Sequence, residues 1–260
     1  MDLTSVDTID RYGDPLTFKL RDATGPSPLL GAEGSDTIKV EARQMAGHQK
    51  EAVVTDGITG AVWRMTSDEG THLTGTDLAP FPLGFFNAGF TGDLHRRILQ
   101  IAEQRSIAIS DIEIELVNHY WLTGSFVQGT GEGHAEPTDI EVRIASPAGT
   151  REVEALVAAA LDASPAVALQ RQALGDNTFA LYINGRRRTV AAGGKAAAAP
   201  SGLALLSAGI SFCYMTQLSR YIENMKFDIG GVRLVQFNPF RAAAKAEALP
   251  IDTHLFLNGA

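Results

Sequence analysis

The only cysteine in the 260-residue chain, Cys213, lies in the mostly apolar stretch SAGISFCYMTQL, which runs from Ser207 to Leu218. A cysteine thiolate is a strong nucleophile that peroxides readily oxidise, so this side chain could attack oxygen or carbon. Gln217 and Arg220 follow about one and two helical turns later, on roughly the same helix face. A nearby guanidinium would lower the pKa of the thiol. The competing interpretation is a small buried hydrophobe, which describes most free cysteines on apolar helices.

A second helical stretch, far upstream, resembles the Cys213 stretch without its cysteine. Residues 79–109 align without a gap with residues 199–229 at a constant offset of 120 positions. The two stretches share the dipeptides Ala-Pro and Ala-Gly, a glutamate and a final isoleucine at matched positions, and Asp93 occupies the place of Cys213. Matching continues into the following strands. We interpret this ordered series as an internal duplication.

The elements that must position these residues can be read from sequence periodicity. Short alternating runs broken by glycine and aspartate predict strands at 16–22, 37–44, 50–56 and 61–65. A long helix over 82–105, strands at 111–121 and 139–145, a second helix over 150–174 that ends at Gly175, and a strand at 178–185 complete the first copy. The second copy has only a helix, a strand and a terminal strand, after the linker-like Ala/Gly-rich residues 190–202. We therefore expect a full unit over 1–190 and a truncated unit over 191–260 that packs on it.

This order of elements resembles the OsmC/Ohr family of thiol-dependent peroxidases. The resemblance is carried by GTHLTGTDLAPFPLGFFNAGFTGD at 70–93, which leads into the first helix, and by LVAAALDASPAVALQ at 156–170 in the second helix. It implies an α+β fold in which antiparallel sheets pack around long central helices. It also implies homodimers with sites at the subunit interface, and reduction of organic hydroperoxides.

The family's functional residues transfer only in part. In the first copy, Asp93 stands where the family has its peroxidatic cysteine, and Ser164 stands where it has the resolving cysteine. The second copy keeps the first thiol as Cys213 and has no helix to supply the second. An arginine that the family places on an early strand corresponds to Arg43, and the carboxylate expected just after Pro82 is missing. An internal disulfide therefore cannot form, and turnover would need an external thiol.

The remaining candidate residues each have a structural alternative. Asp93 is either half of an ordinary helix ion pair or a charge that faces Cys213 across a pseudo-twofold axis and acts as a general base. Phe86 and Phe90 belong to a phenylalanine-rich segment that suits an apolar or aromatic ligand, as any buried helix would. His119, Gln217 and Arg220 complete the candidate substrate-binding residues. We expect GTGEGHAE at 129–136 to be a hairpin loop and GRRR at 185–188 to be a turn.

Composition excludes several classes of function. A net charge of −8 argues against non-specific nucleic-acid binding, which needs a basic surface. One cysteine excludes an internal disulfide framework, and no histidine or carboxylate spacing suggests a metal site or another cofactor. The acidic N-terminal stretch does not resemble a signal peptide, and no apolar run reaches the roughly 20 residues of a membrane span. We expect a cytoplasmic protein without membrane partners.

Three functional hypotheses follow. The first is a one-cysteine peroxidase that reduces organic hydroperoxides, with a small apolar or aromatic substrate and an external thiol reductant, in a chain that could form a homodimer. The second is a hydrolase or lyase in which Cys213 attacks an activated carbonyl at an ester or carbon–carbon bond. The third is a non-catalytic binding protein in which both thiol sites are degenerate.

Overall fold

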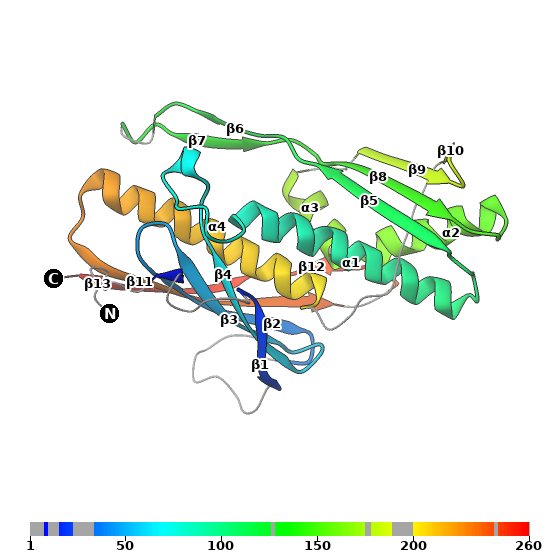
Figure 1. Ribbon diagram of the computed structural model, residues 1–260, viewed down its shortest axis with the longest axis horizontal. Helices are drawn as coiled ribbons and strands as arrows, with labels where there is room; N and C mark the ends of the chain where they lie inside the picture. The colour runs from blue at the N-terminus through cyan, green and yellow to red at the C-terminus, as the bar shows by residue number, and fades with distance from the viewer. Residues whose placement is uncertain are drawn as a thin grey trace. The chain divides into compact units, whose positions relative to one another are not determined.

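The computed structural model describes residues 8–9, 16–22, 34–125, 128–174, 178–188, 200–241 and 244–259 (Figure 1). The chain divides into two compact units whose segments alternate along the sequence. The first unit comprises Met1–Gly89, Ala204–Pro239 and Pro250–Ala260, and the second comprises Phe90–Leu203 and Phe240–Leu249. These compact units do not follow the expected boundary at residue 190, because strands from the end of the chain pair with strands from its beginning. The full and truncated copies themselves stay a prediction.

The first unit is built on an antiparallel sheet with the strand order β1-β4-β3-β2-β11, and β13 pairs with the free side of β11. Its helical elements are the short η2, the first two turns of α1, and most of α4. The bounds are β1 (Phe18–Asp22), β2 (Thr37–Gln44), β3 (Lys50–Asp56), β4 (Ala61–Ser67), η2 (Thr71–Leu73), α1 (Pro82–Gln104), α4 (Gly202–Met225), β11 (Ile229–Arg241) and β13 (Asp252–Gly259).

Helix α4 is held on this sheet by apolar packing and by buried hydroxyl groups. Phe212 is fully buried and contacts Phe85 of α1 edge-to-face, with ring centroids 5.3 Å apart. The Ser211 hydroxyl donates to Gln236 Oε1 of β11 at 2.6 Å. The Ser219 hydroxyl pairs with Gln44 Oε1 of β2 at 2.7 Å. Buried polar groups with partners stabilise only one register, so these bonds fix how α4 lies along the strands.

Glycine 209 allows α4 to approach the first turns of α1. A Cβ at this position would lie 2.6 Å from the backbone nitrogen of Phe86 and 3.0 Å from the carbonyl oxygen of Pro82. Real Cβ atoms do not come this close to backbone, so any side chain here must push the two helices apart. This contact brings the start of α1 against the helix that carries Cys213.

We expect Gly209→Ala to destabilise the protein by about 1–3 kcal/mol through overpacking, although alanine is the better helix former. Denaturant unfolding of the full chain measures this change. Gly84→Ala is the matched control, since its Cβ would meet only the Phe81 ring at 3.5 Å. That control should be neutral or slightly stabilising, and equal losses in both variants would contradict the close-approach argument.

The second unit has a four-stranded sheet of order β10-β9-β8-β5, in which only the β8–β9 pair is parallel, and a separate β6–β7 hairpin. The helices of this unit are α2, α3 and the part of α1 from Phe90 onward. Buried Val153, Leu156 and Val157 form the apolar face of α2. The bounds are β5 (Asp111–Val117), β6 (Tyr120–Thr123), β7 (Glu132–Ala135), β8 (Asp139–Ala145), α2 (Thr150–Ala163), α3 (Pro165–Leu174), β9 (Thr178–Ile183), β10 (Arg186–Arg188) and β12 (Glu247–Ala248).

Several expected elements differ in detail. The helix expected over 150–174 is two helices that meet at Ser164, because Pro165 cannot donate an internal helix bond and starts α3 instead. The strand expected over 111–121 is divided into β5 and β6. The expected loop at 129–136 contains β7, and the GRRR segment forms β10 after a turn at 184–185. Gly175 and most of the expected linker, residues 190–199, lie outside the described residues.

The two long helices end in the same way. Ser106 and Lys226 follow α1 and α4 with φ angles of 54° and 52°. The amide of the next residue then bonds back to a carbonyl five residues earlier, at 2.8 and 3.1 Å. This is a left-handed C-terminal cap with non-glycine residues. The two positions are matched in the sequence alignment, as an internal duplication would predict, and the duplication itself stays a prediction.

Helix α4 is long and apolar enough by composition to cross a membrane. In the structure, 67% of its most apolar window is buried inside the protein, which is typical of the core helix of a soluble protein. The expected cytoplasmic location stays a prediction.

Candidate functional site

Cys213 lines a pocket of about 270 Å³ in the first unit. The thiol is partly buried, and it sits on the same face of α4 as Thr216 and Gln217. The apolar part of the wall comes from the loop before α1 and from the start of that helix. The full lining consists of Glu69, His72, Leu73, Phe81, Pro82, Leu83, Cys213, Thr216 and Gln217.

One buried carboxylate shapes the loop that forms this wall. Asp68 is completely buried at the end of β4. Its Oδ1 accepts the Glu69 amide at 2.8 Å, and its Oδ2 accepts the amide and hydroxyl of Thr76 at 3.1 and 2.6 Å and the Leu78 amide at 3.2 Å. A carboxylate with four donors fixes a turn tightly. Asp68 therefore positions Glu69, His72 and Leu73 around the thiol.

A buried lysine and glutamate lie beside the pocket. Lys50, at the start of β3, is 1% exposed, and Glu69 is 5% exposed. The Lys50 ammonium donates to the carbonyl oxygen of His48 at 2.5 Å and to Thr216 Oγ1 at 2.7 Å. The Thr216 hydroxyl in turn donates to Glu69 Oε1 at 2.6 Å, and Lys50 Nζ lies 3.5 Å from the same oxygen. Thr216 thus connects the two charges across the helix–sheet interface.

The electrostatics of this group act on the thiol in opposite directions. Burial raises the pKa of Cys213, the Glu69 carboxylate raises this pKa further, and the Lys50 ammonium lowers it. Burial lowers the pKa of Lys50 against the opposing effect of Glu69. The net result for Cys213 is a pKa above the ordinary value of 9.0, so the thiol form dominates at neutral pH.

The structure does not bring Arg43 to Cys213. Arg43 is paired in register with Glu51, whose Oε1 accepts its Nε at 2.5 Å, and Arg64 binds the other oxygen of Glu51 at 2.9 Å. Successive side chains of a strand point to opposite faces, and the neighbouring Gln44 faces α4. Arg43 therefore lies on the face of the sheet that does not carry α4.

Lys50 is the cation that sequence reasoning missed. It pairs in register with Gln44, so it shares the face that α4 covers. The signal was present in the run KEAVVTD, where Lys50 occupies the same alternate positions as the buried Ala52 and Val54. Glu69 was also missed, because it belongs to the loop after β4 and not to the segment that follows Pro82.

The expected substrate-binding residues lie in different parts of the structure, and only one of them lines the Cys213 pocket. Gln217 lines the Cys213 pocket, and its role in substrate binding stays a prediction. Phe86 is half-buried and Phe90 is completely buried, and neither lines the pocket. His119 is exposed and pairs with Asp139 at 3.0 Å in the second unit. Arg220 is half-buried on α4 and is not part of the pocket lining.

The aligned partner of Cys213, Asp93, lies in a closed polar cluster of the second unit. Asp93 is 2% exposed, and its Oδ2 accepts the Ser164 hydroxyl at 2.7 Å and the Ala166 amide at 3.3 Å. Arg97 Nε lies 3.4 Å from its other oxygen. Asp93 and Ser164 are the two residues that the family resemblance aligns with the cysteine pair, and here they are hydrogen-bonded to each other. The cluster joins α1 to the start of α3, and its Arg97 contact is the helix ion pair of the structural alternative. The role of Asp93 as a general base stays a prediction.

We expect Asp93→Ala to destabilise the protein by about 1–3 kcal/mol, because the buried Ser164 and Ala166 donors lose their acceptor. Asp93→Asn keeps an acceptor oxygen and should cost less.

Burial raises the pKa of Asp93, with Arg97 and Ser164 opposing this shift. A raised carboxyl pKa favours folding below the unfolded value of 3.8, and this contribution is lost as pH rises through the folded pKa. The stability of Asp93→Asn relative to the native protein should therefore increase as pH rises from acid, in unfolding measured across pH. A flat difference would contradict this assignment.

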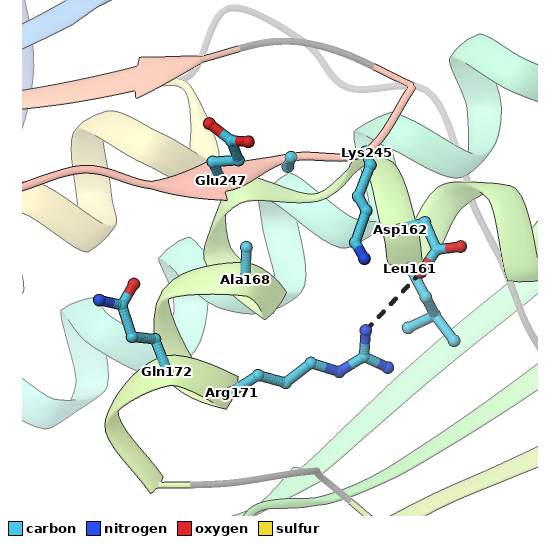
Figure 2. A pocket seen from close by; sticks show the side chains of 8 residues that line it. Leu161, Asp162, Ala168, Arg171, Gln172, Lys245 and Glu247 are labelled. Carbon is cyan, nitrogen blue, oxygen red and sulfur yellow. Dashed lines mark ion pairs between the residues drawn. The ribbon is translucent and has the colours of Figure 1, made fainter.

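A second pocket, of about 390 Å³, lies between α2, α3 and the segment that leads into β12 in the second unit. Figure 2 shows Lys245 extending into it near Arg171, whose guanidinium lies 3.8 Å from Asp162. Its lining has both signs of charge and no cysteine or histidine. Among the described residues, no group of three or more histidine, cysteine or acidic side chains could hold a metal ion.

No protein-family model matches the chain, and no curated protein matches it in sequence. The solved structures that match include several OsmC-like proteins. An OsmC-like hydroperoxide resistance protein from Jannaschia sp. CCS1 is 20% identical, with 49% of this chain and 81% of that chain covered and a TM-score of 0.31. The organic hydroperoxide resistance protein OsmC from Legionella pneumophila is 20% identical over 55% and 95%, with a TM-score of 0.40. An organic hydroperoxide resistance protein from Elizabethkingia anophelis is 13% identical over 60% and 98%, with a TM-score of 0.39.

The expected α+β class is confirmed by the structure, in which β8–β9 is the one parallel pair among the described, otherwise antiparallel, strands. The match to OsmC-like structures extends over about half of the chain, at TM-scores of 0.31 to 0.40. At these identities the OsmC-like match concerns fold alone. The function of the Cys213 pocket has to be argued from its own residues.

Proposed function

We propose that this protein is a one-cysteine thiol peroxidase that reduces organic hydroperoxides at Cys213. The observation that carries the proposal is that the only thiol of the chain lines a pocket whose walls combine apolar and polar side chains. Leu73, Phe81 and Leu83 suit the organic group of a hydroperoxide. The peroxide group would then lie against Cys213, near Gln217 and His72.

The reaction at the thiol balances as follows. The Cys213 thiolate attacks the distal oxygen of the hydroperoxide, the O–O bond breaks, and the alcohol leaves after it gains a proton. Cys213 is then a sulfenic acid. An external thiol condenses with it, releasing water and forming a mixed disulfide. A second external thiol releases the first as a disulfide and restores Cys213.

The charged residues beside the pocket have separate functions in this proposal. Lys50 favours the thiolate, and Glu69 and Thr216 hold the lysine in place. Because burial keeps the pKa of Cys213 raised, the rate should increase with pH through the neutral and alkaline range. A cytoplasmic location would supply low-molecular-weight thiols as the reductant.

The test is to treat the reduced protein with stoichiometric cumene hydroperoxide or hydrogen peroxide in the presence of a sulfenic-acid trap. Intact mass is then followed over seconds to minutes, with Cys213→Ser as the control. The proposal expects fast trapping that depends on Cys213 and is faster with the organic peroxide. A rate no higher than that of a free thiol would exclude the peroxidase and favour the non-catalytic interpretation or another substrate.

A further inference from the structure

One oxygen of Glu69 remains available in the Cys213 pocket. Both Thr216 and Lys50 bind the same oxygen, Oε1. Among the described residues, none makes a hydrogen bond to Oε2, and this atom is not sealed inside the protein. Glu69 lines the pocket together with Cys213, and its charge acts on the thiol, so the oxygen without a protein partner belongs to a carboxylate close to the nucleophile.

The orientation of this carboxylate is fixed from three sides. Asp68 accepts the backbone amide of Glu69, while Thr216 and Lys50 hold its Oε1. A carboxylate held in one orientation, with one free oxygen beside a nucleophile, is suited to remove a proton from water. It is poorly suited to favour a thiolate at rest, because its charge raises the pKa of Cys213. The peroxidase cycle described above assigns no step to this free oxygen.

We propose that the pocket also catalyses acyl transfer, in which Cys213 takes the acyl group of an activated ester of an apolar acid and Glu69 Oε2 activates the water that releases it. The inference rests on Cys213 being the accessible nucleophile of the proposed function. It adds a substrate class, activated esters with an apolar acyl group. It also assigns a catalytic residue, Glu69, and two positioning residues, Lys50 and Thr216.

The acyl-transfer cycle involves no oxidation. The Cys213 sulfur adds to the ester carbonyl, the thiol proton passes through solvent to the leaving oxygen, and the alcohol or phenol departs, leaving a thioester on Cys213. Glu69 Oε2 then takes a proton from water while the oxygen of that water adds to the thioester carbonyl. The C–S bond breaks, the proton returns to the sulfur, and the carboxylic acid is released. The sum is ester plus water giving acid plus alcohol.

The pocket also provides groups for the other parts of the reaction. Leu73, Phe81 and Leu83 are apolar lining residues against which an acyl chain would lie. The Gln217 amide and the His72 ring line the same pocket and are the hydrogen-bond donors available to a developing oxyanion. Gln217 lies one helical turn after Cys213, so both side chains face the same region.

The experiment compares the native full-length protein with Glu69→Gln and Cys213→Ser, using p-nitrophenyl esters of short and medium-length fatty acids. Nitrophenol release gives the burst and the steady state, and intact mass detects the acyl-enzyme. Glu69→Gln keeps an acceptor for Thr216 and removes the negative charge. It should therefore acylate at least as fast as the native protein but lose about a hundredfold in deacylation, so that the acyl-enzyme accumulates.

Two results would overturn the inference. One is deacylation of Glu69→Gln at the native rate, and the other is native protein that is acylated no faster than a free thiol. If Glu69→Gln does not fold, as judged by circular dichroism, the pair Glu69→Gln and Lys50→Met removes both buried charges and is measured in the same way. The sulfenic-acid trap on the same samples separates the two proposals. Trapping without acylation rejects only the esterase, and acylation without trapping rejects only the peroxidase.

Discussion

Glu69→Ala is expected to destabilise the protein by about 3–5 kcal/mol, because it leaves the Lys50 ammonium buried without its carboxylate. Lys50 is 1% exposed, so water cannot replace the lost partner without a rearrangement of β3 or α4. The lysine must then remain charged and unpaired or give up its proton. Chemical denaturation of the full chain, followed by circular dichroism, measures the loss as a lower unfolding midpoint.

The controls for this prediction separate the buried charge from a general loss of contacts. The double variant Lys50→Met, Glu69→Ala should recover most of the stability, because methionine fills the space of the lysine stem without a charge. Glu247→Ala removes an ion pair with Arg241 in which both side chains are about 60% exposed. It should cost less than about 1 kcal/mol. A double variant as unstable as Glu69→Ala would show that the unpaired charge of Lys50 is not the cause of the lost stability.

The second large effect concerns the reactivity of Cys213. Glu69→Gln should accelerate its alkylation by iodoacetamide at neutral pH, because the neighbouring carboxylate raises the pKa of the thiol. Lys50→Met should slow alkylation, because the ammonium lowers that pKa. The thiolate fraction changes about tenfold for each pKa unit, so rates in the two variants should differ by about tenfold or more.

The pH dependence of the alkylation rate shows the direction in which each charge shifts the pKa of Cys213, whatever the absolute rate. In the native protein the alkylation rate should rise with pH to a midpoint above the ordinary thiol value of 9.0. The midpoint should move down in Glu69→Gln and up in Lys50→Met. Thr216→Ser, which retains the hydroxyl between the two charges, should leave the midpoint in place. Midpoints that coincide in all four proteins would show that neither charge acts on Cys213.

Local sequence patterns determined most of the secondary structure. Strands β2, β3 and β8 have the expected bounds, because apolar residues recur at alternate positions and so place one face of each strand against the core. Helix α1 also matches its expected range. Errors occurred where one residue overrides periodicity, as Pro165 does when it divides the expected second helix into α2 and α3. The family resemblance and the importance of Cys213 as a candidate nucleophile also came from the sequence alone.

The division of the chain and the surroundings of the thiol were decided only by the tertiary structure. The expected boundary near residue 190 follows the repeat along the chain, but strand pairing joined β11 to β2 across almost two hundred residues. Lys50, Glu69 and Thr216 are far apart in the sequence and have no shared local motif. Their meeting depends on how α4 lies on the sheet and on how Asp68 turns the following loop. Local propensity predicts neither the position of α4 on the sheet nor the path of this loop, since both depend on burial and on hydrogen bonds between distant residues.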